Sequence, residues 1–188
     1  MMKQSSLPEM INQSRDVILH PGVSTFERYE QHGTMKEAAI YVGIAAFISG
    51  LLGLVGGFGG FITGFIAALI QFFVFTGMVY FVGKKMYAGT GTWDEVAYTF
   101  SLFIAPLIVV SALISLIVSF FAWIPLLNLI VALLGFFVRL IVLVFQVYYA
   151  YIAVQSSMNL FDRTQALLTL VLSYIGTLVI MFIVFSIF

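Results

Sequence analysis

Five long apolar runs separated by short linkers constrain this chain more than any other feature. They cover about residues 37–57, 60–82, 96–120, 126–154 and 165–187. An α-helix needs roughly 20 apolar residues to cross a hydrocarbon core about 30 Å thick, and each run is near or above that length. The chain is also 62% hydrophobic and 9% charged, which leaves too few polar side chains to cover a water-soluble domain of this size. We therefore predict an all-α, polytopic membrane protein with a bundle of five transmembrane helices.

The basic residues predict the orientation of these helices. Seven of the eight Lys and Arg residues precede the first run or follow the second or fourth run, namely Lys3, Arg15, Arg28, Lys36, Lys84, Lys85 and Arg163. The linkers around residues 56–60 and 121–126 carry no charge. Because basic residues concentrate in cytoplasmic loops, we expect the N-terminus to be cytoplasmic and the C-terminus to lie outside.

The chain divides into a cytoplasmic N-terminal arm, residues 1–36, and a five-helix transmembrane domain, residues 37–188. We expect the polar residues 1–16 to be poorly ordered. Residues 25–32 predict a short interfacial helix beneath the lipid headgroups, with a mobile linker as the alternative. A cleavable signal peptide is not expected, because about 36 polar residues precede a first run that is too long for its apolar region. The absence of Cys excludes disulfides and cysteine-ligated metals.

Most acidic residues are explained as helix caps rather than as catalytic groups. A Ser, Thr or Asp followed three residues later by Glu or Gln satisfies the free N–H groups at a helix start. This pattern occurs at four places, Ser24/Glu27, Thr34/Glu37, Thr92/Glu95 and Asp162/Gln165. The last three open the three helices that we expect to start in the cytoplasm, so the caps and the basic residues predict the same topology.

Aromatic residues gather near the predicted cytoplasmic ends of the helices. Eight of the nine tyrosines fall there, and Trp93 marks the same level while Trp123 marks the opposite one. Amphipathic rings prefer the headgroup zone, so we interpret this set as an interfacial belt. His20 and His32 lack metal-ligand spacing, and we expect both to be solvated or interfacial.

The predicted outer turn between the first two helices is rich in glycine. Gly53, Gly56, Gly57, Gly59, Gly60 and Gly64 lie there, with three overlapping four-residue spacings. Glycine at this spacing allows helix backbones to approach closely in lipid. We predict a tight hairpin that packs within the chain. The alternatives are a homodimer seam and a re-entrant element that lines a pathway.

Arg139 is the one basic residue inside an apolar run, far from both predicted membrane boundaries. A central Arg costs at least about 2.5–3.5 kcal/mol on insertion scales, so it should face protein or water. Alignment of the helices by depth predicts a polar midplane around it, made of Gln71, Ser111, Ser173, Tyr174 and Thr177, with Gln146 on the same face of its helix. Pro106 interrupts the third run close by and frees a backbone carbonyl.

Three interpretations of Arg139 remain open at this point. It could clamp neighbouring helices through their carbonyl and amide groups, bind an anionic solute or lipid headgroup, or reach water along a tilted helix. Enzymatic signatures are missing, because the runs contain neither His nor paired carboxylates. We therefore predict no enzyme activity, no cofactor, no metal site and no nucleic-acid partner.

The order of these parts resembles the Yip family of five-span membrane proteins (Ypt-interacting proteins, the Yip domain). The resemblance spans roughly residues 20–187. It rests on His20-Pro21-Gly22-Val23-Ser24-Thr25-Phe26, the glycine-rich hairpin, the stretch from Tyr87 to Val96, and Ala105-Pro106. Eukaryotic members act in vesicle traffic and bind prenylated Rab GTPases. This chain lacks their long cytoplasmic domain and their Asp-Leu-Tyr-Gly-Pro motif, and it is more similar to compact prokaryotic members, which implies a prokaryotic cytoplasmic membrane.

Together these observations predict a non-enzymatic membrane-organising or adaptor protein that acts through its cytoplasmic face. The predicted contact surface comprises Pro21, Phe26, Lys84, Lys85 and Trp93. Its expected partners are the bilayer, anionic lipid, and a cytoplasmic or membrane protein. The competing hypothesis is a small transporter or channel, and it requires a hydrated cavity that reaches Arg139.

Overall fold

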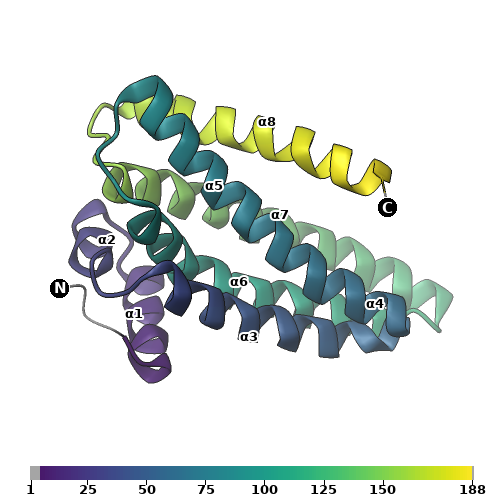
Figure 1. Cartoon of the computed structure of the whole chain (residues 1–188). Helices are drawn as coiled ribbons and strands as arrows, with labels where there is room; N and C mark the ends of the chain where they lie inside the picture. Colours follow the sequence, from purple (N-terminus) through teal and green to yellow (C-terminus); the bar gives the residue numbers. More distant parts are fainter. Residues whose placement is uncertain (1–4, 188) are drawn as a thin grey trace.

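The computed structural model describes residues 5–187, and every regular element in that range is a helix (Figure 1). Five helical segments are long and apolar enough to cross a membrane: Met35–Gly56, Phe58–Tyr87, Trp93–Phe120, Pro125–Ser157 and Arg163–Val184. Each predicted run lies largely within one of them, with boundaries shifted by a few residues. The predicted fold, an all-α bundle with five membrane-spanning helices, is confirmed.

The N-terminal arm is more ordered than the sequence predicted. Residues 7–16, expected to be poorly ordered, belong to helix α1 (Leu7–Leu19), while residues 1–4 lie outside the described range. A capping box formed by Ser6 and Glu9 starts this helix. Met10 and Val17 lie on the same face of the helix, and both are buried. The segment is therefore held by tertiary packing, which a count of its polar residues does not reveal.

The second helix of the arm, α2 (Val23–Tyr29), begins earlier than predicted. Gly22 is its N-cap, and the carbonyl of Gly22 accepts hydrogen bonds from the N–H groups of Thr25 and Phe26. Ser24 therefore lies inside the helix, and the predicted Ser24/Glu27 cap is wrong. The mobile-linker alternative is also wrong, because Thr25 and Phe26 are buried against the bundle.

The caps predicted for the spanning helices are present. Thr34 and Glu37 form the box that starts α3 (Met35–Gly53), and Thr92 and Glu95 form the box that starts α6 (Trp93–Phe120). For α8 (Arg163–Ile187), Asp162 Oδ1 accepts from the N–H of Thr164 at 2.8 Å. These bonds satisfy donors that no intrahelical carbonyl can reach.

Helix α6 occupies the centre of the bundle. It packs against α3, against α5 (Ala68–Tyr87), against α7 (Pro125–Ser157) and against α1. Every residue from 96 to 105 is buried, so this part of α6, which we call its buried half because it lies toward the arm end, is surrounded on all sides. The helix also continues through Pro106, which does not interrupt it as predicted.

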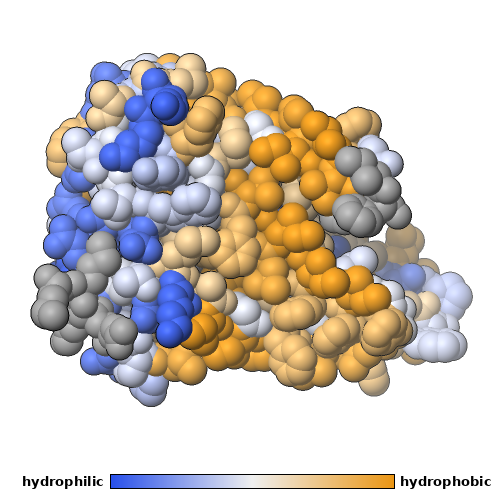
Figure 2. All heavy atoms as spheres, viewed as in Figure 1, coloured by the Kyte–Doolittle hydropathy of each residue, from blue (hydrophilic) through white to orange (hydrophobic). Residues whose placement is uncertain are grey.

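The two ends of the bundle differ in chemistry. We call the end that carries α1, α2 and the loops at residues 88–92 and 158–162 the arm end, and the end that carries the turns at residues 54–57 and 121–124 the hairpin end. Hydrophilic residues gather at the arm end and hydrophobic ones cover the spanning helices (Figure 2). The N-terminal and C-terminal ends of the described chain lie at opposite ends of the bundle (Figure 1).

The glycine-rich hairpin is closed by direct backbone contact. The chain runs from α3 through η1 (Leu54–Gly56), α4 (Phe58–Ile62) and η2 (Thr63–Ala67, one turn of π-helix) into α5. Gly57 has φ +84°, a conformation that only glycine adopts readily, and it makes the turn. A Cβ on Gly53 would lie 2.5 Å from the carbonyl oxygen of Gly60, and one on Gly64 would lie 3.0 Å from that of Ser49. Gly53, Gly60 and Gly64 thus pack within the chain, whereas the close packing predicted for Gly56 and Gly57 is absent, because a Cβ at either would meet nothing within 4 Å.

This geometry predicts that a single methyl group at the crossing destabilises the hairpin. We expect Gly53→Ala to lower the free energy of unfolding by about 1–3 kcal/mol, because the added carbon overlaps backbone that cannot rotate away. Thermal denaturation of the purified protein in detergent measures the effect. Gly56→Ala is the matched control, since a Cβ there meets nothing within 4 Å. Equal melting temperatures for the two variants would contradict the packing described.

Candidate functional site

Buried tyrosines attach the arm to the spanning helices. The Tyr98 hydroxyl of α6 donates to Gln13 Oε1 at 2.6 Å, and the Tyr149 hydroxyl of α7 donates to the carbonyl of Ile18 at 3.1 Å. On α3, the hydroxyls of Tyr41 and Ser14 are 2.9 Å apart. Tyr98 and Tyr149 are almost wholly buried, so they are not part of the interfacial belt that the sequence predicted. Together with Tyr41, they bond α1 to three different spanning helices instead.

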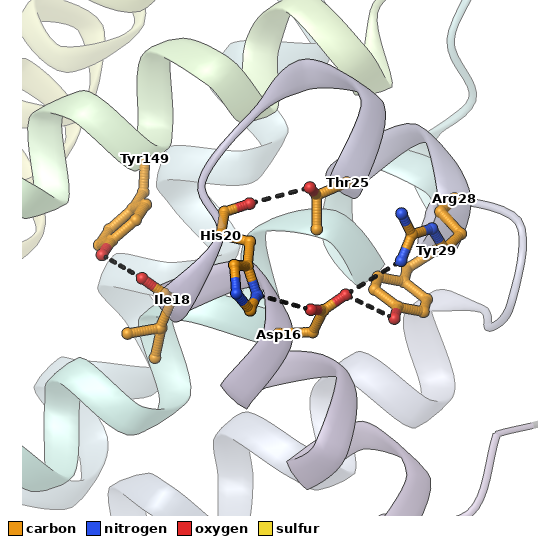
Figure 3. A network of polar contacts seen from close by, with 7 residues as sticks. All are labelled: Asp16, Ile18, His20, Thr25, Arg28, Tyr29 and Tyr149. Atoms are coloured by element: carbon orange, nitrogen blue, oxygen red, sulfur yellow. Dashed lines mark hydrogen bonds and ion pairs between the residues drawn. The ribbon is translucent and has the colours of Figure 1, made fainter.

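A polar network around Asp16 joins α1 to α2 (Figure 3). Asp16 accepts from the Tyr29 hydroxyl at 2.8 Å and from Arg28 Nη1 at 3.2 Å, and its other oxygen is 3.0 Å from His20 Nδ1. The bond from Tyr29, followed by that from His20, lowers the pKa of Asp16 below its ordinary value. The side chain of His20 is largely exposed, as expected from the sequence, but it is bonded to Asp16 within the arm. The network fixes the turn that folds α2 back over α1.

Glu30 is a buried carboxyl group under the arm. It follows α2, and its Oε2 accepts from the Ser156 hydroxyl of α7 at 2.7 Å. Burial is the largest influence on its pKa and raises it; the bond from Ser156 acts in the opposite direction, while the nearby Glu95 and Glu27 raise it further. Burial between the arm and the bundle thus disfavours the charged form of this carboxyl group.

We predict that Glu30 makes the arm less stable as the pH rises. Between the ordinary carboxyl pKa of 4.5 and the higher value in the folded state, the folded protein holds a proton that the unfolded chain has released, so the free energy of unfolding falls across this window. Glu30→Gln removes the charge and should melt at a higher temperature than the wild type at pH 7.5. The difference should vanish near pH 4. The exposed Glu27→Gln is the charge-matched control, and an equal gain there would contradict the assignment.

The structure separates the five residues of the predicted contact surface. Lys84 and Lys85 are exposed, and Lys84 Nζ donates to the carbonyl of Thr90 at 3.3 Å. Trp93 stacks on Tyr80 with ring centroids 5.8 Å apart and remains 40% exposed, while Pro21 is half-buried. Phe26 is wholly buried, with its ring 6.2 Å from that of Phe103, so it cannot touch a partner. It anchors the arm.

The position of Phe26 predicts a structural effect for its truncation. We expect Phe26→Ala to cost about 3–5 kcal/mol of stability, because the cavity left between α2 and α6 cannot close. Protease cleavage within α1 or α2 should accelerate in parallel. Ser24→Ala, an exposed position of the same helix, is the control and should match the wild type. A fully stable Phe26→Ala protein would contradict this anchoring role.

A groove of about 500 Å³ opens between the spanning helices in the hairpin-end half. Its walls come from α3, the α4–η2 segment, α5 and α6, and Gln146 of α7 reaches it. Its polar lining includes Ser49, Thr63, Gln71, Ser111, Ser115, Ser119 and Gln146. Toward the arm end the groove stops at Ile104, where α6 becomes fully buried.

Arg139 of α7 is not enclosed by the bundle: its side chain is exposed, and it does not line the groove but lies beside it. Its Nη2 donates to Ser115 Oγ at 3.0 Å, and Ser115 Oγ in turn donates to the carbonyl of Ser111 at 3.0 Å. At about 1.5 Å per residue, Arg139 is about 21 Å from the start of α7 and about 27 Å from its end. It therefore sits near the middle of a span.

Comparison with known proteins adds a family to this geometry. A family model, the Yip1 domain, matches residues 15–187. The chain belongs to the Yip1 domain family. The match starts inside α1 and therefore includes the end of that helix and all of α2. No curated protein and no solved structure matches the chain.

In this Yip1 domain, the predicted midplane is divided between two places. Gln71, Ser111 and Gln146 line the groove beside Arg139. Ser173 and Thr177 are buried on α8, where the Thr177 hydroxyl donates to the carbonyl of Ser173, and Tyr174 is exposed. Because α8 packs on α5 and α7, its polar face meets those helices and not the groove. The expectation that all six residues surround Arg139 does not hold.

Several groove residues of the Yip1 domain were not predicted from the sequence, namely Ser49, Thr63, Ser115 and Ser119. The four-residue spacing of Ser111, Ser115 and Ser119 was the available signal, since it places them on one face of α6. Among residues 5–187, no group of three His, Asp or Glu side chains is arranged to hold a metal ion. The polar side chains that line the groove carry hydroxyl and amide groups, and the Arg139 guanidinium is bonded to one of them, Ser115.

Proposed function

We propose that this Yip1 domain is a non-enzymatic membrane adaptor whose arm end binds a protein partner. The observation that carries the proposal is the docking of the arm onto the bundle, α1 by the hydrogen bonds of Tyr98 and Tyr149 and α2 by the buried Phe26. A surface that is held in one conformation before binding loses little entropy when a partner arrives. Lys84, Lys85 and Trp93 stand at the rim of this preformed surface.

The proposed orientation places the arm end in the cytoplasm. Within the described residues, the basic side chains other than Arg139 all belong to the arm or to loops and helix ends at the arm end, and Lys3 lies outside the described range. This distribution supports a cytoplasmic arm end and a C-terminus on the other side. The hairpin end carries no charged residue in either turn.

The dense packing around α6 favours an adaptor over a channel. A pathway from one face to the other would have to pass the layer between Val96 and Ala105, where every residue of α6 is buried. The groove stops at Ile104, within this layer. A groove that ends there can bind a molecule but does not form a conduit along α6 in this conformation.

The orientation is tested with single cysteines in this cysteine-free chain. Met86→Cys at the arm end and Gly59→Cys at the hairpin end both replace exposed residues. In intact cells, an impermeant thiol reagent should label Gly59→Cys, whereas Met86→Cys should react only after permeabilisation. The opposite pattern would reverse the proposed topology.

Partner binding is tested by photo-crosslinking from the same two ends. A photoreactive residue at position 86 should yield a discrete adduct with another protein, while one at position 123, where Trp123 is 89% exposed at the hairpin end, should yield none. Lys84→Glu combined with Lys85→Glu should abolish the adduct without lowering the melting temperature. Adducts from both ends, or adducts that ignore the charge reversal, would rule out an arm-end binding surface.

A further inference from the structure

The hairpin-end groove holds polar groups that the protein itself does not satisfy. The side chains of Gln71 and Gln146 make no hydrogen bond with any residue in the range 5–187, and the Ser49, Ser111 and Ser119 hydroxyls likewise lack one. Each of these groups costs free energy in a hydrocarbon environment unless something else bonds to it. The groove is therefore built for an occupant that accepts or donates hydrogen bonds.

The charge of the groove selects an anion. Arg139 is the only charged side chain more than three residues inside the five described spans. It has five N–H donors, and within the described chain its only hydrogen bond is the one to Ser115. No carboxylate lines the groove, so the positive charge has no counter-ion there. Gln146, seven residues after Arg139, lies on the same face of α7 and adds amide donors about 10 Å nearer the arm end.

The remaining walls indicate that the anion is attached to an apolar body. Leu52, Leu107, Ile108 and Leu116 line the same groove as the serines and glutamines. α7 beside it exposes apolar side chains such as Leu133, Phe136 and Leu140, which places the groove next to the bilayer and not behind a protein wall. A small hydrated anion gains nothing from these surfaces, whereas an amphipathic molecule buries its apolar part against them.

We propose that this groove binds the phosphate of a phospholipid headgroup. The phosphate oxygens accept from the Arg139 guanidinium, the amides of Gln71 and Gln146 donate to the ester carbonyls nearer the arm end, and the upper acyl carbons lie along the leucine and isoleucine wall. The lipid enters from the hairpin-end leaflet, because the groove is closed toward the arm end. This site is independent of the arm-end surface and of the protein partner proposed for it.

The test is lipid-dependent stabilisation of the purified full-length chain in detergent. Phosphatidylglycerol and phosphatidylcholine, which both carry the phosphate, should raise the melting temperature, and native mass spectrometry should detect one retained lipid. Diacylglycerol lacks the phosphate, and inorganic phosphate lacks the apolar body, so neither should raise it. Stabilisation by inorganic phosphate as strong as that by lipid would overturn the lipid assignment, and no stabilisation by either phospholipid would overturn the site.

Variants locate the binding. Arg139→Leu and the double change Gln71→Leu with Gln146→Leu replace exposed or half-buried groups, so the fold should persist. We expect each to raise the lipid concentration at half-maximal stabilisation about tenfold or more, as loss of a hydrogen bond to a charged group does. Tyr174→Phe, a polar group at similar depth but outside the groove, should leave it unchanged. Undiminished stabilisation in both groove variants would show that the lipid binds elsewhere and would overturn the proposal.

Discussion

The complete burial of residues 96–105 of α6 is the constraint on which the rest of this structure depends. Helices in lipid gain little from the hydrophobic effect when they meet, so their association relies on close packing and polar bonds. The buried half of α6 supplies both, with Ala97, Thr99 and Ser101 allowing close approach and Tyr98 bonding to the arm. The arm adds a contribution that lipid cannot supply, because Met10, Val17 and Phe26 leave water when they pack on the helix ends. Stability is therefore concentrated at the arm end.

The hairpin end is looser as a consequence. There α7 has large exposed apolar side chains over most of its circumference, and the first two spans are held together by glycine backbone contacts. The face of α6 that could have filled the gap carries Ser111, Ser115 and Ser119 in place of large apolar residues. The groove thus forms because α6 carries small polar side chains toward the hairpin end, whereas its residues toward the arm end are buried by neighbouring helices.

The sequence predicts the parts of this fold that are determined locally. Span number follows from apolar length, and the starts of α3 and α6 follow from Thr34/Glu37 and Thr92/Glu95, because a cap needs only residues three positions apart. The ordered structure of the arm cannot be predicted from local sequence, because it depends on pairs such as Gln13 and Tyr98, which are 85 residues apart. The same limit explains why Phe26 was wrongly predicted to be part of an exposed contact surface. Its burial depends on Phe103, which is distant in sequence and packs against it.

The candidate site shows the same limit in another form. Counting residues along a helix gives the depth of a side chain in the membrane, but the direction it faces depends on which helices are neighbours. Depth alone placed Ser173 and Thr177 beside Arg139. Both instead lie on the side of α8 that packs against its neighbouring helices, where Gly176 of α8 leaves room for Met78 of α5. The patterns that identify a face are periodic within one helix: Arg139 with Gln146, which the sequence analysis used, and Ser111 with Ser115, which it did not. Two such faces on adjacent helices, α6 and α7, meet at a single hydrogen bond, and that meeting converts isolated polar residues into a groove with one charge and no counter-ion.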